Sequence, residues 1–308
     1  MAPGDAMIMR AAAAARSLAR LARSFAHHPL TRQRPLAAFA RFLCWQALSR
    51  IDGGIHIRPF VSGTKLAIRH GMHAATANIY VGLMEFEEMG FALHLLRSGD
   101  LFVDVGANVG TYCVIASGAC QARTLAVEPN PATLAALERN VELNGLGQRV
   151  RIAKMAAGAQ AGAVSITTSL DSLNHVADAG ETAPTVTVAV DTLDHLLGYD
   201  VPILIKIDVE GYESAVLEGA QRLLADHGLK ALIIELNGSG ARYGAADAAI
   251  HANLIGQGFA PCRYDPRARR LDPMPSFGSH NTIYVRDMAF VAERLANAPA
   301  FTVLGQRI

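Results

Sequence analysis

From residue 100 onward the chain alternates short apolar runs with segments of helical periodicity, and this alternation constrains the fold more than any other feature. The apolar runs are too short for helices, while the stretches between them repeat apolar residues every three or four positions. Such alternation predicts a mainly parallel sheet covered by helices on both faces. With 51% apolar residues, the 308-residue chain can bury the core of such an α/β domain. The predicted strands are residues 101–105, 123–127, 150–155, 202–207 and 230–235, with a late strand at 281–287.

Two helices between these strands have clear sequence signals. The first has Asn130 as a favourable N-cap, Pro131 in the first turn and Gly145 after its end. The second follows "KIDVEGY" and carries apolar residues at helical spacing from position 215 to 224. Both predict helices packed on the sheet.

The first hundred residues have a different character. Residues 1–50 are predicted to form a basic, amphipathic helical extension. Alternating apolar positions around Ser62 and Gly63 indicate a hairpin, so residues 51–98 are predicted to form a hairpin and helix cap. The α/β domain is expected over residues 99–290, and a C-terminal tail over 291–308.

The first helix of the extension carries arginines on one face and apolar residues on another. These are Arg16, Arg20 and Arg23, and Leu18, Leu21 and Phe25 respectively. Arginines throughout the segment exclude a secretory signal peptide. Such a helix can lie on an anionic membrane, pack on another subunit or remain a solvated extension.

Composition sets limits on partners and location. Lys and Arg number 28 against 27 Asp and Glu, so no overall field draws the protein to nucleic acid. Four scattered cysteines without a CxxC pair predict reduced, mostly buried thiols rather than a zinc site. No apolar run approaches the roughly 18 residues of a membrane-spanning helix. We therefore expect a cytoplasmic protein, with peripheral membrane contact through the N-terminal helix as an alternative; the sequence carries no signal for oligomeric state.

The loop "DVGANVG" after the first predicted strand is the first candidate ligand site. A dinucleotide fingerprint needs a glycine where this loop has Asn108, because the backbone must approach a pyrophosphate. No Lys or Arg lies within the loop or close to it in sequence, so a polyanion is a poor ligand. S-adenosylmethionine has no phosphate, and its sulfonium and ammonium cations favour an acidic neighbour such as Asp104. We predict that Asp104, Gly106, Asn108 and Gly110 shape a site for this cofactor.

An acid at the end of the next strand supports the same ligand. Glu128 lies 18 residues after Gly110, close to the roughly 20-residue spacing of nucleoside-binding α/β folds. A carboxylate there can accept hydrogen bonds from both ribose hydroxyls. Asn130, at the start of the following helix, is predicted to line the same site. The alternative is a generic strand–loop–helix unit with polar ends.

Further motifs follow in order along the chain: "EPNPATLAALERNVELNG", "SLN" at 172–174, "TLD" at 192–194 and "IKIDVEGYESAVLEGA". Together with "DVGANVG" they resemble the FkbM family of S-adenosylmethionine-dependent methyltransferases, over about residues 80–285. The resemblance implies a class I methyltransferase domain: a seven-stranded, mostly parallel sheet whose last strand is antiparallel, with the cofactor over the carboxyl ends of the first strands. It also implies that Ala156 meets the adenine through its backbone.

Acidic residues at two other strand ends are candidates for the chemistry. Asp208 directly follows a strand and is predicted to contact the reacting centre, with Glu210 in the same loop. The alternative is that both acids cap the following helix. Lys206 is interpreted as a strand residue that pairs locally. If Glu235 approaches Asp208 and Glu210, three carboxylates could instead hold Mg²⁺ or Ca²⁺.

Methyl transfer to a hydroxyl also needs a proton acceptor, for which His175 and His280 are candidates because imidazole titrates near working pH. The chain lacks the [DN]PP[YFW] motif of amine and amide N-methyltransferases. The resemblance implies O-methylation, so the predicted function is methyl transfer to a hydroxyl of a saccharide or glycan. A polyketide-type acceptor is the first alternative. A noncatalytic nucleoside-binding or membrane-associated scaffold is the second.

Overall fold

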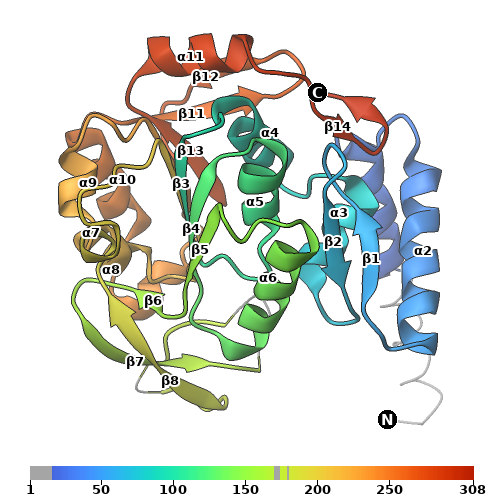
Figure 1. Ribbon diagram of the computed structural model, residues 1–308, viewed down its shortest axis with the longest axis horizontal. Coiled ribbons are helices and arrows are strands. Elements are labelled where there is room, and N and C mark those ends of the chain that lie inside the picture. The colour runs from blue at the N-terminus through green and yellow to red at the C-terminus, as the bar shows by residue number, and fades with distance from the viewer. Residues whose placement is uncertain (1–15, 170–173, 179) are drawn as a thin grey trace.

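The computed structural model describes residues 16–169, 174–178 and 180–308. Ser172 and Leu173 of the "SLN" motif, and the first fifteen residues of the predicted extension, lie outside this range. The rest of the chain forms a large sheet with helices on both sides, a smaller sheet and an N-terminal extension (Figure 1).

The large sheet has eight strands in the order β12-β11-β13-β10-β9-β3-β4-β5. The five strands from β10 to β5 are parallel, whereas β13 is antiparallel to both β10 and β11. This confirms the predicted class I arrangement, and β12 adds an eighth strand at the edge beside β11. The strands are β3 (Leu101–Val105), β4 (Arg123–Val127), β5 (Val150–Ala153), β9 (Leu204–Ile207), β10 (Ala231–Glu235), β11 (Ala260–Asp265), β12 (Arg270–Pro273) and β13 (Asn281–Val285).

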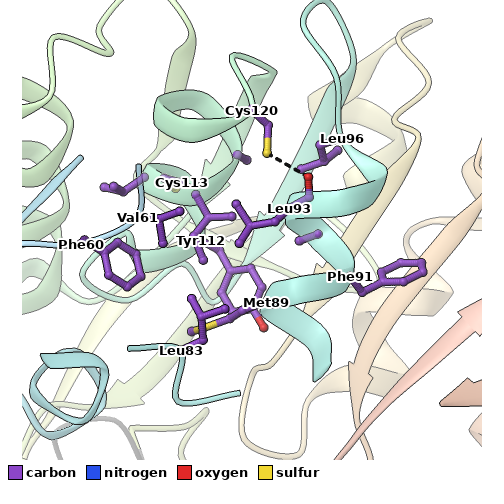
Figure 2. Packing of buried hydrophobic residues seen from close by; sticks show 14 of the residues in the cluster. Phe60, Val61, Leu83, Met89, Phe91, Leu93, Leu96, Tyr112, Cys113 and Cys120 are labelled. Carbon is purple, nitrogen blue, oxygen red and sulfur yellow. Dashed lines mark hydrogen bonds between the residues drawn. The ribbon is translucent and has the colours of Figure 1, made fainter. Parts of the chain in front are cut away.

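Alternate residues of the strands point into two hydrophobic cores, one on each face of the sheet. On β3, Phe102 belongs to the first core and Val103 to the second, and both are fully buried. The first core is covered by α4 (Phe86–Leu95), α5 (Thr111–Cys113), the π-helix η1 (Val114–Ala119), α6 (Pro131–Leu143) and α11 (Met288–Ala296). The second is covered by α7 (Leu193–Leu197), α8 (Glu213–Glu218), α9 (Gln221–Ala225) and α10 (Asp247–Gly256). Figure 2 shows part of the first core, where Tyr112 packs beside Met89.

The single helix expected after "KIDVEGY" is in fact the two short helices α8 and α9. Gly219 lies between them, and a Cβ atom there would come within 2.0 Å of the Gly158 carbonyl oxygen. The chain therefore turns where two backbones touch, a tertiary constraint that apolar periodicity does not reveal.

A second sheet, in the order β6-β8-β7, is inserted after β5 and was not predicted. It consists of β6 (Ala156–Ala157), β7 (Gly162–Thr167) and β8 (Thr185–Asp191). The third strand of the large sheet, predicted over 150–155, already ends at Ala153, and Ala156 begins β6.

The N-terminal extension packs against the first core. Residues 16–27 are helical, and they are followed by α2 (Pro35–Ile51), the hairpin of β1 (His56–Pro59) and β2 (Lys65–Ile68), and α3 (His73–Val81). The predicted hairpin is thus confirmed. In the first helix Phe25 is only 2% exposed and packs against Phe42 and Tyr80, whereas Leu18 of the same apolar face is 43% exposed.

The C-terminal residues, expected as a tail, end α11 and then form the hairpin of β14 (Thr302–Val303) and β15 (Gln306–Arg307). Ser62 donates its backbone N–H to the Thr302 carbonyl at 2.9 Å, which joins this hairpin to the extension. None of the helices in the described part of the chain is long and apolar enough to cross a bilayer. The four cysteines are free, and only Cys44 is exposed.

Asn140 on α6 links the extension to the glycine loop. Its side chain is fully buried, its Oδ1 accepts from the Ala67 N–H at 2.7 Å, and its Nδ2 donates to the Val109 carbonyl at 2.8 Å. Both backbone groups are buried and would lose their partner together.

Replacing Asn140 with alanine is therefore expected to lower the free energy of unfolding by about 2 to 4 kcal/mol, measured by urea denaturation. Asn144→Ala is the matched control, because its two bonds to Lys65 lie nearer to solvent, and it should cost less. Equal stabilities of the two variants would contradict this account of Asn140.

Candidate active site

The loop between β3 and α5 packs directly on the end of β9. Gly106 has φ +79°, and a Cβ atom there would lie 1.9 Å from the Asp208 carbonyl oxygen. Gly110 has φ +84°, and its Cβ would lie 2.5 Å from Leu137 of α6. Both positions therefore require glycine for close packing as well as for backbone conformation. Asn108 also adopts a left-handed conformation, at φ +49°.

Glu128 fixes this loop from the neighbouring strand. Its carboxylate is 5% exposed and accepts the backbone N–H groups of Asn108 at 2.7 Å and Asn130 at 2.8 Å, and the Thr133 hydroxyl at 2.8 Å. Burial raises the pKa of Glu128, while these three donors oppose that shift. Oε2 accepts only the bond from Asn108 among these, so a lone pair remains for a further donor. Asn130 caps α6 as predicted, through its side chain and the Ala132 N–H.

The first cavity at this edge of the sheet is formed around Glu128. Gly106, Asn108, Glu128, Asn130 and Ala156 all line it, so the structure brings together most of the predicted cofactor residues. Its apolar wall comes from Val127, Ala157, Ile166, Val176 and Val209. Apolar walls with a buried carboxylate at one side suit an adenosine: the walls suit the base, and the free lone pair of Glu128 suits a ribose hydroxyl.

A second cavity lies on the other side of the glycine loop. The two cavities share Gly106, Asn108, Asp208 and Glu210, so they adjoin along the carboxyl ends of β3 and β9. Asp104 lines the second cavity but is 1% exposed, beside the Cys113 thiol at 3.5 Å. Burial raises the pKa of Asp104 to about 6. Gly110 lines neither cavity, and its contribution is to the packing of the loop on α6.

Three carboxylates converge in this second cavity. Asp208, Glu210 and Glu235 each place an oxygen within 4.8 Å of the others. Burial, followed by repulsion from Asp208, raises the pKa of Glu210 to about 7 and that of Glu235 to about 8. Oε2 of Glu235 is enclosed and has no hydrogen-bond partner within the described part of the chain. The spacing of the three acids in the sequence could not show whether they lie close together.

Lys206 holds one member of the group in place. Its Nζ lies 2.7 Å from Oδ2 of Asp208, and the lysine is 4% exposed. Burial favours the neutral amine, but the carboxylates of Asp208, Glu85 and Asp104 outweigh it and raise the pKa of Lys206. The lysine therefore carries a buried positive charge beneath the acids, a larger role than the local pairing expected of it.

The acids do not cap the helix that follows them. Helix α8 begins at Glu213, whose own carboxylate accepts the backbone N–H groups of Val209 at 3.0 Å and Gly211 at 3.2 Å. Glu213 thus holds the loop in place, and Asp208 and Glu210 line the two cavities. The alternative that Asp208 and Glu210 cap the following helix is therefore wrong.

The two predicted histidines have different surroundings. His175 is 8% exposed, lines the first cavity and contacts Oε2 of Glu181 through Nε2 at 3.0 Å. His280 is exposed, contacts the Ser279 carbonyl, and lines neither cavity. The structure therefore does not bring His280 to the carboxylates, and it places His175 on the Glu128 side.

Residues before the α/β domain complete the second cavity and were missed. Glu85 accepts the Tyr112 hydroxyl at 2.6 Å, and Lys206 lies 5.0 Å from the Tyr112 ring centre. Asn78 and Met84 come from α3 and the loop after it. No local signal marks these residues, because only the packing of the extension brings them to the sheet.

Comparison with known proteins gives a family. The model of the FkbM methyltransferase domain matches residues 104–261, just over half of the chain. No match was found among curated proteins. A solved FkbM methyltransferase from Methylobacillus flagellatus is 18% identical with a TM-score of 0.43, over 80% of this chain and 59% of that one. The chain thus spans about three fifths of the length of that protein.

A precorrin-6Y C5,15-methyltransferase from Geobacter metallireducens is 13% identical with a TM-score of 0.39, over 67% of this chain and 89% of that one. The assignment rests on the family model, which covers the glycine loop, Glu128 and the acids of β9 and β10. Membership of a methyltransferase family favours an enzyme over the noncatalytic scaffold that the sequence left as the second alternative. The chain belongs to the FkbM family of S-adenosylmethionine-dependent methyltransferases.

Proposed function

We propose that this enzyme methylates a hydroxyl group of an uncharged acceptor, most simply a saccharide or glycan. The observation that carries the proposal is the convergence of Asp208, Glu210 and Glu235 beside the glycine loop. Carboxylates at this place suit the recognition of hydroxyl groups and the removal of their protons.

For the cofactor, we assign the first cavity to the adenosine and the second to the methionine portion and the acceptor. Glu128 would hold the ribose, with Asn108 and Asn130 beside it, and Ala156 would line the adenine. The acids around the second cavity favour the two cations of S-adenosylmethionine. Gly106 lets the loop lie close enough to Asp208 for donor and acceptor to meet.

S-adenosylmethionine supplies an activated methyl group, whose bond to sulfur breaks as the bond to the acceptor oxygen forms. The protein must align the acceptor, exclude water and take the hydroxyl proton. A base works best when its pKa is near the operating pH, which suits Glu235 with its pKa of about 8. In this proposal Glu235 takes the proton of the acceptor hydroxyl. Asp208 orients that hydroxyl, and Lys206 holds Asp208 in place through Nζ, 2.7 Å from Oδ2. Glu210 supports the raised pKa of Glu235, and we give His280 no role.

The charge of the second cavity favours a neutral acceptor. Among the residues that the structure describes, five acids line it and one base, Lys206, which Asp208 already pairs. A phosphate or carboxylate on the acceptor would be repelled by the ionised acids, because the one lysine is already paired. The acids are Glu85, Asp104, Asp208, Glu210 and Glu235. The many acceptor oxygens instead match the hydroxyl donors of a polyol.

A polyketide-type acceptor is the second candidate. Met84, Met89 and Tyr112 give the second cavity an apolar wall that would suit a flat or aliphatic ring. Such an acceptor would use this wall more than the carboxylates.

The test is a panel of acceptors incubated with purified enzyme and S-adenosylmethionine, with S-adenosylhomocysteine measured as product. We expect turnover with neutral glycosides and none with the same sugars carrying a phosphate. Turnover of phosphorylated sugars alone would contradict the proposal, and turnover of polyketide hydroxyls alone would favour the second candidate.

Each reaction is repeated with EDTA. Activity that survives assigns the acids to proton transfer, whereas activity lost and restored by Mg²⁺ or Ca²⁺ would assign them to a metal ion.

A further inference from the structure

The outward face of α2 is apolar and open to solvent. This helix lies at the edge of the molecule, on the far side of the extension from the large sheet (Figure 1). Its inner face buries Ala38, Trp45 and Ser49. Eight of its residues are exposed, and all of these except Arg50 are apolar. The apolar ones, which we call the outer stripe, are Leu36, Ala37, Ala40, Leu43, Cys44, Ala47 and Ile51.

A helix that is apolar on both faces is normally covered on both. Here Leu36 and Ile51 are each 83% exposed, and Leu43 is 49% exposed. Their separations of seven and eight residues place them along one line of the helix, over about 22 Å. A continuous apolar line of this kind marks an interaction surface, unlike single exposed apolar residues.

The charge of the extension that carries the outer stripe identifies the partner. Residues 16–58 contain eight arginines and a single acid, Asp52, although the whole chain has a net charge of only +1. None of these arginines pairs with a carboxylate among the residues that the structure describes. The exposed ones are Arg16, Arg20, Arg23, Arg32, Arg34 and Arg50. The extension is thus a basic pole on an otherwise acidic molecule.

We propose that the outer stripe of α2 docks the enzyme on the surface of an anionic lipid bilayer. The apolar residues would enter the head-group region, and the exposed arginines of the extension would meet lipid phosphates. A second copy of the chain would instead bring two basic poles together with almost no acid to pair them, which opposes a dimer at this face. The docking face lies on α2 and not on the first helix, whose Phe25 is buried in the protein. The proposal does not depend on the acceptor.

The test is flotation of the full-length protein with vesicles of phosphatidylcholine alone or mixed with phosphatidylglycerol. We expect binding to the mixed vesicles only, weakened by added salt. The triple variant Leu36→Ser/Leu43→Ser/Ile51→Ser should lower the partition coefficient by about tenfold or more. The control is Tyr199→Ser/Ile255→Ser, which removes exposed apolar side chains elsewhere and should bind as wild type does.

Both variants should bind S-adenosylhomocysteine as wild type does, which shows that they are folded. Wild type that ignores both kinds of vesicle, or a triple variant that binds them as well as wild type, would overturn the proposal. So would a wild-type dimer, seen by light scattering, that the triple variant turns into a monomer, because a second copy would then cover the stripe.

Discussion

Replacing Glu235 with glutamine is expected to lower kcat by about 10²- to 10⁴-fold, because the variant keeps the shape of the side chain but cannot take the acceptor proton. The wild-type rate should rise with pH as Glu210 and Glu235, with pKa values of about 7 and 8, lose their protons. A base acts only when deprotonated, so the rate falls below these values and levels off above them. The variant should lose the part of the rise that belongs to Glu235.

Glu142→Gln is the matched control for that experiment, since it makes the same chemical change on the exposed side of α6. It should leave both the rate and the pH profile unchanged. A Glu235→Gln enzyme with wild-type turnover and an unchanged pH profile would remove Glu235 from the proton transfer.

Gly106→Ala is expected to lower kcat/KM by about 10²-fold, since displacing the reacting groups by about 1 Å has an effect of this size. The new methyl group would lie 1.9 Å from the Asp208 carbonyl oxygen, so the glycine loop and the end of β9 must move apart. These two segments carry the cofactor side and the acid side of the site. The measurement is steady-state kinetics on the acceptor identified by the panel.

Gly99→Ala separates this effect from backbone strain. Gly99 has φ +87°, close to the +79° of Gly106, but no atom lies within 4 Å of its added Cβ. The control should therefore lose some stability and keep its kcat/KM. If the two alanine variants were equally active, close packing of Gly106 on Asp208 would not matter for catalysis.

The sequence predicted the parts of this fold that local chemistry determines. Asn130 and Pro131 begin α6 as expected, because a capping side chain and a fixed φ act within one turn. The glycine loop and Glu128 could be paired from spacing, since the carboxyl ends of adjacent parallel strands lie at one edge of a sheet. Features that depend on long-range packing could not be predicted from the sequence. The break at Gly219 depends on the backbone of Gly158, which no pattern near Gly219 encodes.

In the candidate site, too, local features could be predicted and long-range contacts could not. Asp208 could be placed at the sheet edge from its position after a strand, but its approach to Glu235 depends on the twist and stagger of β9 and β10. Glu85 and Asn78 reach the second cavity only because the N-terminal extension folds back on the first core. His280 immediately precedes β13 and lies outside both cavities. The sequence can place a residue at the end of a strand, but it does not determine where its side chain points.

The most direct test of the central claim, that the edge of β3 and β4 binds S-adenosylmethionine, is calorimetric titration with S-adenosylhomocysteine. Wild type, Glu128→Ala and the surface control Glu142→Ala are compared. We expect wild type and the control to bind alike, and Glu128→Ala to bind more weakly by about 1 to 3 kcal/mol, a roughly 5- to 150-fold rise in Kd. A folded Glu128→Ala protein with wild-type affinity would remove Glu128 from the site. A folded wild type that does not bind would contradict the account of the cofactor site as a whole.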